Sequence, residues 1–404
     1  MDFNVQADTQ EISVFRKEVR EWLQENMRGA EGLRWSATWS TRENEEEYQF
    51  RRKLARKLGE KGWLFPMFPV EYGGAGLTID HQLVLETELD HYGINLAAVF
   101  YTLARIVAPV ILKWGAEEQK REFLPPMLRG EVSVWQVLTE PQGGSDIATC
   151  RTKAIRNGDH YVVNGQKIMV GYHHPPDFLW TLVCTDPSGP RHENLGWLYI
   201  PGNSAGITIQ PMSLMMGIKN SVFFDNVRVP AFNLVGGENN GWRVANTHLE
   251  LEHGGEGRVG ADPLVERVVE YCQQMRVAGT PLMEDTSIRD IIADMLIELH
   301  VVHHFARRNF WHRYVREPHP YGGAQFRYYQ RMVRLRNGER LQRIMGYDAL
   351  VPDLTVNEVV DFEYVVRSGP GMLHGGGTLD TDRLVFARRV GLGRPTKEKA
   401  PTTI

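Results

Sequence analysis

The order of hydrophobic periods along the chain constrains its fold more than any other feature of the sequence. Helical spacing begins at Ile12, Phe15 and Val19 and recurs up to about residue 130. From about residue 132 to 236, short β-forming runs are separated by Gly, Pro and Asn, and helical spacing then returns almost to the end. The sequence therefore predicts an α+β protein with a helical domain at 1–130, a β-barrel or β-sandwich domain at 131–240 and a helical domain at 241–404.

Two local patterns give more detail within these domains. Asn164-Gly165 stands between two β-forming runs, 161–163 and 166–170, and this pair favours the turn of a β-hairpin. Apolar residues at helical spacing between 288 and 302 predict one long helix.

Composition excludes several classes of protein. The 404 residues include 46 Lys and Arg and 50 Asp and Glu, for a formal charge of −4, which argues against a nucleic-acid partner and a polybasic membrane anchor. Three cysteines are too few for a disulfide framework or a thiolate metal site. His300 and His304 have a spacing that can hold a metal, but no third ligand accompanies them, so no metal site is predicted. The polar N-terminus and the lack of an apolar run of about 18–20 residues predict a cytoplasmic protein without a membrane span.

The stretch at 137–154 is the best candidate for ligand binding. Gly143-Gly144 allows backbone to come close to a ligand, and the hydroxyls of Thr139 and Ser145 could bind a polar ring edge or a phosphate. Such a turn by itself is more often only a loop.

Several motifs together give a resemblance. The sequence TEPQGGSD followed by VVNGQK resembles the middle domain of the acyl-CoA dehydrogenase family. PVEYGGAGLT, GAEEQKREFLPPMLRGE, DNVRVPAFNLVGGENNGW and GGGTLDTDRLVFARRVGLGR also resemble family motifs, in the family's order, over roughly residues 10 to 394. The resemblance implies a helical N-terminal domain, a β-barrel middle domain and a C-terminal four-helix bundle, with FAD between the β-domain and the C-terminal helices.

The resemblance also implies which residues contact the cofactor. These are Gln136, Val137, Leu138 and Thr139 along the flavin ring; Gly144 and Ser145 at the cofactor phosphate or the CoA moiety; Met169, Val170 and Gly171, where relatives usually have Trp and Thr; Arg276 at the pyrophosphate across a dimer interface; and Gly377, Thr378 and Asp380 in the C-terminal glycine loop.

The reaction implied by the resemblance needs a base. An α-proton of a thioester is weakly acidic, so the base must be a carboxylate held in a dry site. Many family members carry this Glu in the C-terminal loop, where this chain has Gly376. Other branches carry it on the first helix after the β-domain, and Glu252 is in that register. Glu250 falls where relatives bind CoA, and His253, which replaces the Arg that usually follows the base, is a candidate contact to the substrate. Residues two apart face different sides of a helix, so at most one of Glu250 and Glu252 can face the flavin.

The implied function is FAD-dependent α,β-dehydrogenation of an acyl-CoA thioester. Glu252 would remove the α-proton, a hydride would pass to flavin N5, and an electron-transfer flavoprotein would reoxidise the flavin. The chain would form a homo- or hetero-oligomer, a dimer or tetramer, and the earlier Glu resembles branches acting on branched, long or ring-bearing acyl groups. Two alternatives stay open: a flavin-binding relative with oxidase or lyase-like chemistry, and a non-catalytic half-site subunit of a heteromeric acyl-CoA dehydrogenase.

Overall fold

A computed structural model describes residues 8–28, 45–92, 104–171, 173–253, 262–315, 317, 319–351 and 361–392 of the chain. These residues form two compact units, one spanning Asp8–Glu252 and the other beginning at His253. The helical N-terminal part and the β-sheet thus share one unit. The three domain boundaries inferred from the sequence stay a prediction.

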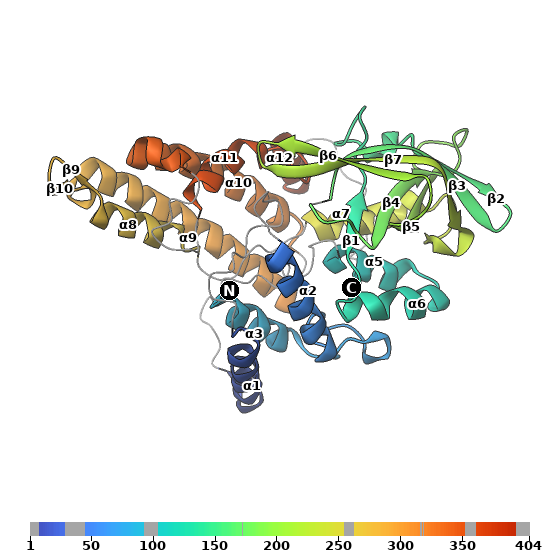
Figure 1. Ribbon diagram of the computed structural model, residues 1–404, viewed down its shortest axis with the longest axis horizontal. Helices are drawn as coiled ribbons and strands as arrows, with labels where there is room; N and C mark the ends of the chain where they lie inside the picture. Colours follow the sequence, from blue (N-terminus) through green and yellow to red (C-terminus); the bar gives the residue numbers. More distant parts are fainter. Residues whose placement is uncertain are drawn as a thin grey trace. The chain divides into compact units, whose positions relative to one another are not determined.

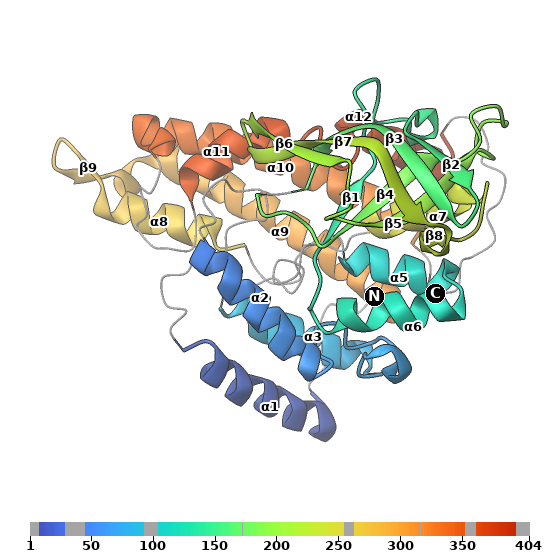
Figure 2. The ribbon, with the colours of Figure 1, turned by 45° about the vertical axis from the view of Figure 1, so that its right-hand side comes forward.

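Helices make up the first part of the N-terminal unit, as the hydrophobic spacing predicts. They are α1 Gln10–Asn26, α2 Glu45–Glu60, α3 Ile79–Asp90, α5 Ala104–Trp114 and α6 Glu117–Leu128. Ile12, Val19 and Leu23 form the buried face of α1. In Figures 1 and 2, α5 and α6 lie side by side below the strands of the same unit.

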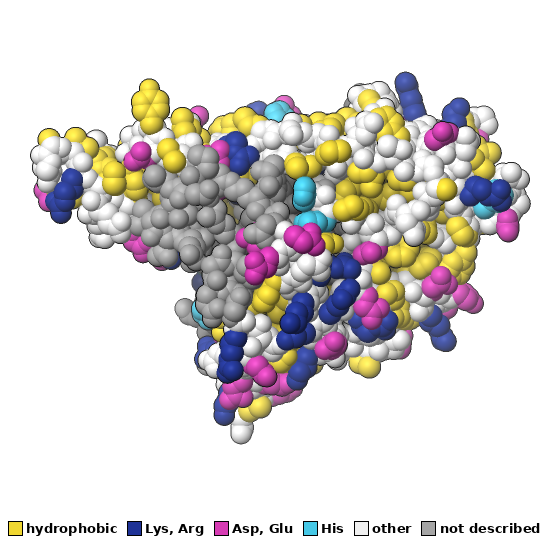
Figure 3. Space-filling model, in the orientation of Figure 1, with side chains coloured by type: hydrophobic (Ala, Val, Ile, Leu, Met, Phe, Trp, Pro, Cys, Tyr) yellow, Lys and Arg dark blue, Asp and Glu magenta, His cyan; other side chains and the backbone are white. Residues whose placement is uncertain are grey.

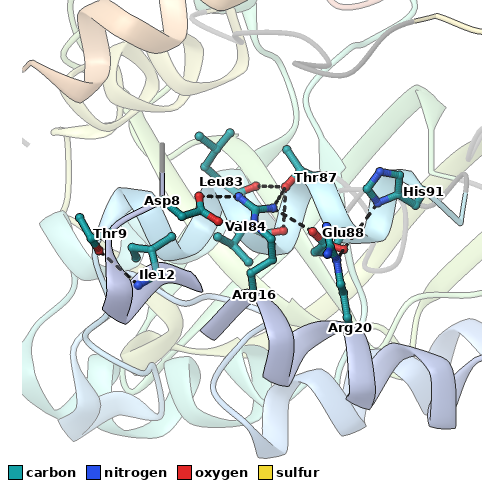
Figure 4. A network of polar contacts seen from close by, with 10 residues as sticks. All are labelled: Asp8, Thr9, Ile12, Arg16, Arg20, Leu83, Val84, Thr87, Glu88 and His91. Atoms are coloured by element: carbon teal, nitrogen blue, oxygen red, sulfur yellow. Dashed lines mark hydrogen bonds and ion pairs between the residues drawn. The ribbon is translucent and has the colours of Figure 1, made fainter. Parts of the chain in front are cut away.

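A buried carboxylate fastens α1 to α3. Glu88 of α3, whose side chain is 3% exposed, pairs with Arg16 at 2.8 Å and with Arg20 at 2.7 Å (Figure 4). Burial raises the pKa of Glu88, but the two guanidinium groups outweigh this effect and lower it below the usual value. At the start of α1, the Thr9 hydroxyl accepts a hydrogen bond from the Ile12 amide and so caps the helix.

The surface of these helices carries both signs of charge. Figure 3 shows Lys and Arg side chains interspersed with Asp and Glu over α1 and α2, in keeping with the small net charge of −4. Within the described ranges, no helix is long and apolar enough to cross a membrane.

One eight-stranded sheet follows in the same unit. Its strands are β1 Val134–Val137, β2 Lys153–Asn157, β3 His160–Val170, β4 Phe178–Cys184, β5 Leu195–Pro201, β6 Ile207–Leu214, β7 Gly217–Pro230 and β8 Leu234–Val235. They are ordered β6-β7-β3-β2-β4-β5-β8, and β1 pairs parallel with β4 (Figure 1). Helix α7, Gly241–His253, comes next.

The two faces of this sheet enter different cores, and this decides where α7 packs. Trp180 and Trp197 join the apolar cluster of the N-terminal helices, which also includes Val244 of α7. Leu179 precedes Trp180 in β4 and Leu198 follows Trp197 in β5, and both leucines belong to a second cluster on the other face. Helix α7 therefore packs on the face that carries the two tryptophans.

The hairpin predicted at Asn164-Gly165 is wrong. Strand β3 runs through both residues without a turn, and its pairing with β7 shifts register between Val163 and Gly165. A Cβ at Gly165 would lie 2.6 Å from the Thr152 hydroxyl oxygen, so glycine is required here for close strand packing rather than for a turn. The hairpin that does form joins β2 to β3 through the turn that follows Asn157.

The C-terminal unit is predominantly helical. It comprises α8 Leu264–Gln274, a short hairpin of β9 Arg276–Val277 and β10 Thr280–Pro281, α9 Thr286–Tyr314, α10 Gly322–Met345, α11 Phe362–Gly371 and α12 Leu379–Arg389. Helix α10 packs against α9, α11 and α12 (Figure 1). The predicted long helix is confirmed as α9, with Ile288, Ile292 and Met295 buried. The α+β fold class is confirmed, with helices before and after the sheet in the sequence.

Candidate active site

The side chains of Gln136 and Glu252 meet although they lie 116 residues apart in the sequence. Gln136 is the position of β1 that faces α7, and its amide nitrogen donates to Glu252 Oε2 at 3.1 Å. The Glu252 side chain is 18% exposed, near the end of α7. A predicted cofactor contact and the predicted base are therefore in direct contact within the N-terminal unit.

Indole groups hold α7 against the sheet and the neighbouring helix. Trp197 Nε1 donates to the Gly241 carbonyl at 2.9 Å, and Trp114 Nε1 donates to the Thr247 hydroxyl at 3.0 Å. Trp180 Nε1 donates to His248 Nδ1 at 3.3 Å. These three donors are distributed along α7, so the helix presents Glu252 from a rigid support.

The two segments predicted to face the flavin are joined by hydrogen bonds. The Ile168 amide in β3 donates to the Thr139 carbonyl at 2.9 Å. Lys167 Nζ, from the same strand, donates to the Leu138 carbonyl at 3.1 Å. The stretch after β1 and the end of β3 are therefore parts of one surface.

The residues predicted along this first segment differ in what they can offer a ligand. Val137 and Leu138 have buried side chains, so only their backbone groups can reach a cofactor. Gly144 lies against Thr139, because a Cβ at Gly144 would be 3.0 Å from the threonine methyl carbon. Ser145 is exposed and has its hydroxyl at the surface of the loop.

A buried ion pair lies directly behind this loop. Lys167, which is fully buried, is 2.8 Å from Glu140, whose side chain is 4% exposed. Glu140 also accepts hydrogen bonds from the amides of Arg151 at 2.7 Å and Thr152 at 2.9 Å, and from the Cys150 thiol. Burial by itself raises the pKa of Glu140, but the Lys167 ammonium and these donors outweigh it and lower the pKa to about 2. Burial raises the pKa of the Cys150 thiol to about 12, so this sulfur stays protonated.

The segment Met169-Val170-Gly171 forms a bend at the end of β3. Met169 has φ 58° and a 50% exposed side chain, whereas Val170 is buried. Lys219 Nζ donates to the Gly171 carbonyl at 2.9 Å, and Asn220 Nδ2 donates to the Val170 carbonyl at 3.0 Å. Met169 is thus the side chain that this segment offers to a ligand, where relatives are expected to offer other groups.

Gly171 provides a test of how tightly this bend is built. A Cβ there would lie 2.1 Å from the Trp135 ring, and φ is +61°. We expect Gly171→Ala to lower the free energy of unfolding by about 3 kcal/mol, measured from urea unfolding curves. Gly158→Ala is the matched control, because Gly158 has φ +64° with nothing within 4 Å of the added Cβ, and we expect a loss of about 1 kcal/mol there. Equal losses in the two variants would contradict the role of the Trp135 contact.

The remaining predicted cofactor residues lie in the C-terminal unit. Arg276 is exposed in the β9–β10 hairpin and donates to the Gly279 carbonyl at 3.3 Å. Thr378 caps α12 by accepting from the Thr381 amide at 3.2 Å, and Asp380 is exposed in the first turn of that helix.

The C-terminal glycine loop is held by an arginine. Arg331 of α10 donates to the carbonyls of Gly375 and Gly377, at 2.6 Å each, and lies 2.9 Å from the buried Asp382. Gly376, which the resemblance aligns with the base of many family members, is part of this clamped loop. The loop therefore presents backbone groups at that position.

Two predicted substrate contacts and two residues that were not predicted lie on or next to α7. Glu250 is half-buried on α7, and the side chain of His253 lies outside the described residues. His248 and Trp180 were not predicted, although the spacing of His248 and Glu252, one helical turn apart, was a signal for a shared face. Among the described residues, no three or more His, Cys, Asp or Glu are grouped as metal ligands.

Comparison with known proteins identifies the family. Models of the N-terminal, middle and C-terminal domains of acyl-CoA dehydrogenase match residues 9–131, 136–227 and 239–391. The chain therefore belongs to the acyl-CoA dehydrogenase family, whose members are flavin-dependent oxidoreductases that act on CH–CH groups.

Individual relatives cover different shares of the chain. Acyl-CoA dehydrogenase FadE29 of Mycobacterium tuberculosis is 37% identical to this chain over 203 residues, which are 50% of this chain. The matched part of the chain spans about half of the length of FadE29, 52%. The ChsE4-ChsE5 complex of the same organism includes a chain with TM-score 0.77 and 25% identity, over 97% of this chain and 100% of that one. The Tcur3481-Tcur3483 steroid ACAD has TM-score 0.77 and 26% identity, over 98% and 100% of the two chains.

Proposed function

We propose that this protein catalyses the FAD-dependent α,β-dehydrogenation of an acyl-CoA thioester, with Glu252 as the base. The observation that carries the proposal is the contact of Glu252 with Gln136, since it joins the carboxylate to the segment that leads into the flavin-binding motif. Membership of the acyl-CoA dehydrogenase family supports the reaction class.

The described residues fit a flavin at this place. The hydrogen bond from Ile168 to Thr139 unites two segments that bear exposed groups, the Gly144-Ser145 turn and Met169. Backbone groups of 136–139 and the Thr139 hydroxyl would bind the polar edge of the ring, and Met169 would pack on its face. When bound, FAD takes up the two electrons and one hydrogen that leave the β-carbon of the substrate.

The chain's own residues supply the proton chemistry. Glu252, in its ionised form, accepts the α-proton as the α,β double bond forms, and becomes a neutral acid. Gln136 holds the carboxylate through Oε2, so that its orientation is set before the substrate arrives. The 18% exposure of Glu252 provides access for a substrate.

Anaerobic titration of the purified protein tests this proposal. We expect a yellow protein whose visible flavin absorbance disappears on addition of a suitable acyl-CoA, with appearance of the enoyl-CoA. Turnover without flavin reduction would support oxidase or lyase-like chemistry instead. A panel of branched and ring-bearing acyl-CoA esters is the first choice, because the Tcur3481-Tcur3483 relative is a steroid ACAD. Reoxidation of the reduced flavin by an added electron-transfer flavoprotein would establish that protein as the electron acceptor.

Arg276 gives a separate prediction for FAD retention. If its guanidinium binds the pyrophosphate across a homodimer, Arg276→Ala should lose roughly tenfold to a hundredfold in FAD affinity, because charge-assisted hydrogen bonds contribute about 1.5–3 kcal/mol. Flavin content after gel filtration and thermal unfolding of the apoprotein are the measurements. Arg289→Ala, at an exposed position of α9, is the control. Unchanged flavin content in Arg276→Ala would exclude this role.

A half-site subunit is the second candidate function. Gly376 and His253 depart from the family's usual residues, and two structural relatives are pairs of different chains, ChsE4-ChsE5 and Tcur3481-Tcur3483. In such a heteromer a second chain would complete the site. A stable but colourless protein, when purified alone and supplied with FAD, would favour this candidate over an independent homo-oligomeric enzyme.

A further inference from the structure

Two neighbouring strands contact two successive turns of α7. Gln136 of β1 and Trp180 of β4 are aligned as partners in the parallel pair, and both side chains reach α7. Gln136 donates to Glu252, and Trp180 donates to His248, which is one helical turn earlier. His248 Nε2 lies 3.8 Å from the same oxygen of Glu252 that Gln136 contacts. We propose that His248 is a positioning residue for Glu252, held by Trp180 as the neutral tautomer that carries its proton on Nε2. This inference rests on the proposed role of Glu252 as base.

The contact with Trp180 decides the tautomer. An indole N–H can only donate a hydrogen bond, so His248 Nδ1 must present its lone pair at 3.3 Å. An imidazolium or an Nδ1–H tautomer would place two hydrogens against each other. The proton of the neutral ring is therefore on Nε2, the nitrogen that faces Glu252.

Aromatic packing prevents the ring from turning away. His248 is fully buried, and its ring centre is 4.8 Å from that of Trp197. Trp197 in turn stacks on Trp180, with ring centres 5.0 Å apart and planes at 24°. Trp197 therefore packs against both the imidazole of His248 and the indole of Trp180 that binds its Nδ1.

The Nε2–H of His248 acts on the carboxylate as an oriented dipole. At 3.8 Å the contact is electrostatic rather than a hydrogen bond. Together with the Gln136 amide, it holds the Oε2 side of the carboxylate towards the protein. The ring cannot take the proton from Glu252, since Nε2 already carries one and Nδ1 is engaged by Trp180. The abstracted proton therefore does not pass to His248, and it exchanges with solvent from the 18% exposed side chain of Glu252.

Deuterium uptake at the α-carbon of a bound acyl-CoA in D₂O measures this effect. We expect His248→Phe, which keeps an aromatic ring next to Trp197, to lower the exchange rate at saturating substrate about tenfold to a hundredfold. Flavin content and KM should change by less than about threefold. His248→Gln, which can present an N–H near the former Nε2, should recover most of the rate. His81→Phe is the control, because His81 of α3 is also buried and also packs against an aromatic ring, that of Phe15.

The tautomer has its own spectroscopic test. In sedimented protein labelled with ¹⁵N-histidine, solid-state NMR should show the signal of a neutral Nε2–H histidine that disappears in His248→Phe. That signal is assigned to His248 by its loss. An Nδ1–H or doubly protonated signal for His248 would overturn the inference. If His248→Phe matches the wild type in exchange while Glu252→Gln does not, the positioning role is wrong and the proposed function stands. If Glu252→Gln exchanges normally, the proposed base itself is wrong.

Discussion

Glu252→Gln should retain FAD and lose α-proton exchange by roughly 10³–10⁴-fold, the contribution expected of a general base. Glutamine keeps the shape of the side chain and can still pair with Gln136, so the fold and the cofactor site should be preserved. The measurements are deuterium uptake at the acyl α-carbon, the flavin-to-protein ratio and the dissociation constant of an acyl-CoA.

Two further variants sharpen the assignment of Glu252. Glu250→Gln alters a carboxylate two residues away on α7, which is predicted to contact CoA, so we expect a higher KM with little change of rate at saturation. Glu60→Gln, at an exposed position of α2, should behave like the wild type. If α-proton exchange survives in Glu252→Gln, or is lost only in Glu250→Gln, then Glu252 is not the base.

Lys167→Met should produce the largest loss of stability. The substitution leaves the Glu140 carboxylate buried without its ammonium partner, which costs about 3–5 kcal/mol in comparable sites. It also removes the donor to the Leu138 carbonyl, so flavin content should fall. Urea unfolding curves and visible absorbance are the measurements.

Matched variants separate the ion pair from general effects of the substitution. Lys153→Met makes the same change at an exposed position of β2, and we expect less than about 0.5 kcal/mol. Glu140→Gln combined with Lys167→Met should recover part of the loss, because neither partner is then left as an isolated buried charge. A single Lys167→Met variant as stable as Lys153→Met would show that the pair contributes little.

The same ion pair predicts an acid limit of stability. The folded pKa of Glu140 is lowered to about 2, from an unfolded value near 4.5. The unfolded chain therefore binds the proton first on acidification, and the stabilisation is present above about pH 4.5 and lost as the pH falls towards 2. Without the ammonium the folded pKa rises, so this part of the acid dependence should shrink in Lys167→Met.

Much of the architecture could be predicted because its signals are local. The alternation of helical and β periods needs only neighbouring residues, and it identified the helical ends, the middle sheet and α9. The motifs in their order were enough for the family. The failure at Asn164-Gly165 has a physical reason of its own. Gly165 is required by its contact with Thr152, a residue just before β2 that a local turn rule does not consider.

The contacts between the candidate site residues could not be predicted from the sequence, for a related reason. Sequence register alone indicated Glu252, because the preceding motif sets its place on the helix. Its contact with Gln136 comes from a residue 116 positions away, and the link between Lys167 and Leu138 joins two different segments.

The sequence by itself determined the family, the order of the secondary structure and the residue types available for proton abstraction. Only the tertiary structure decided that Trp180 contacts His248 and that His248 faces Glu252. A histidine's tautomer depends on the donor or acceptor that each ring nitrogen meets, and that partner is chosen by how α7 packs on the sheet. Periodicity describes which face of an element is buried, whereas the chemistry of a buried polar group depends on the individual atoms that packing brings to it.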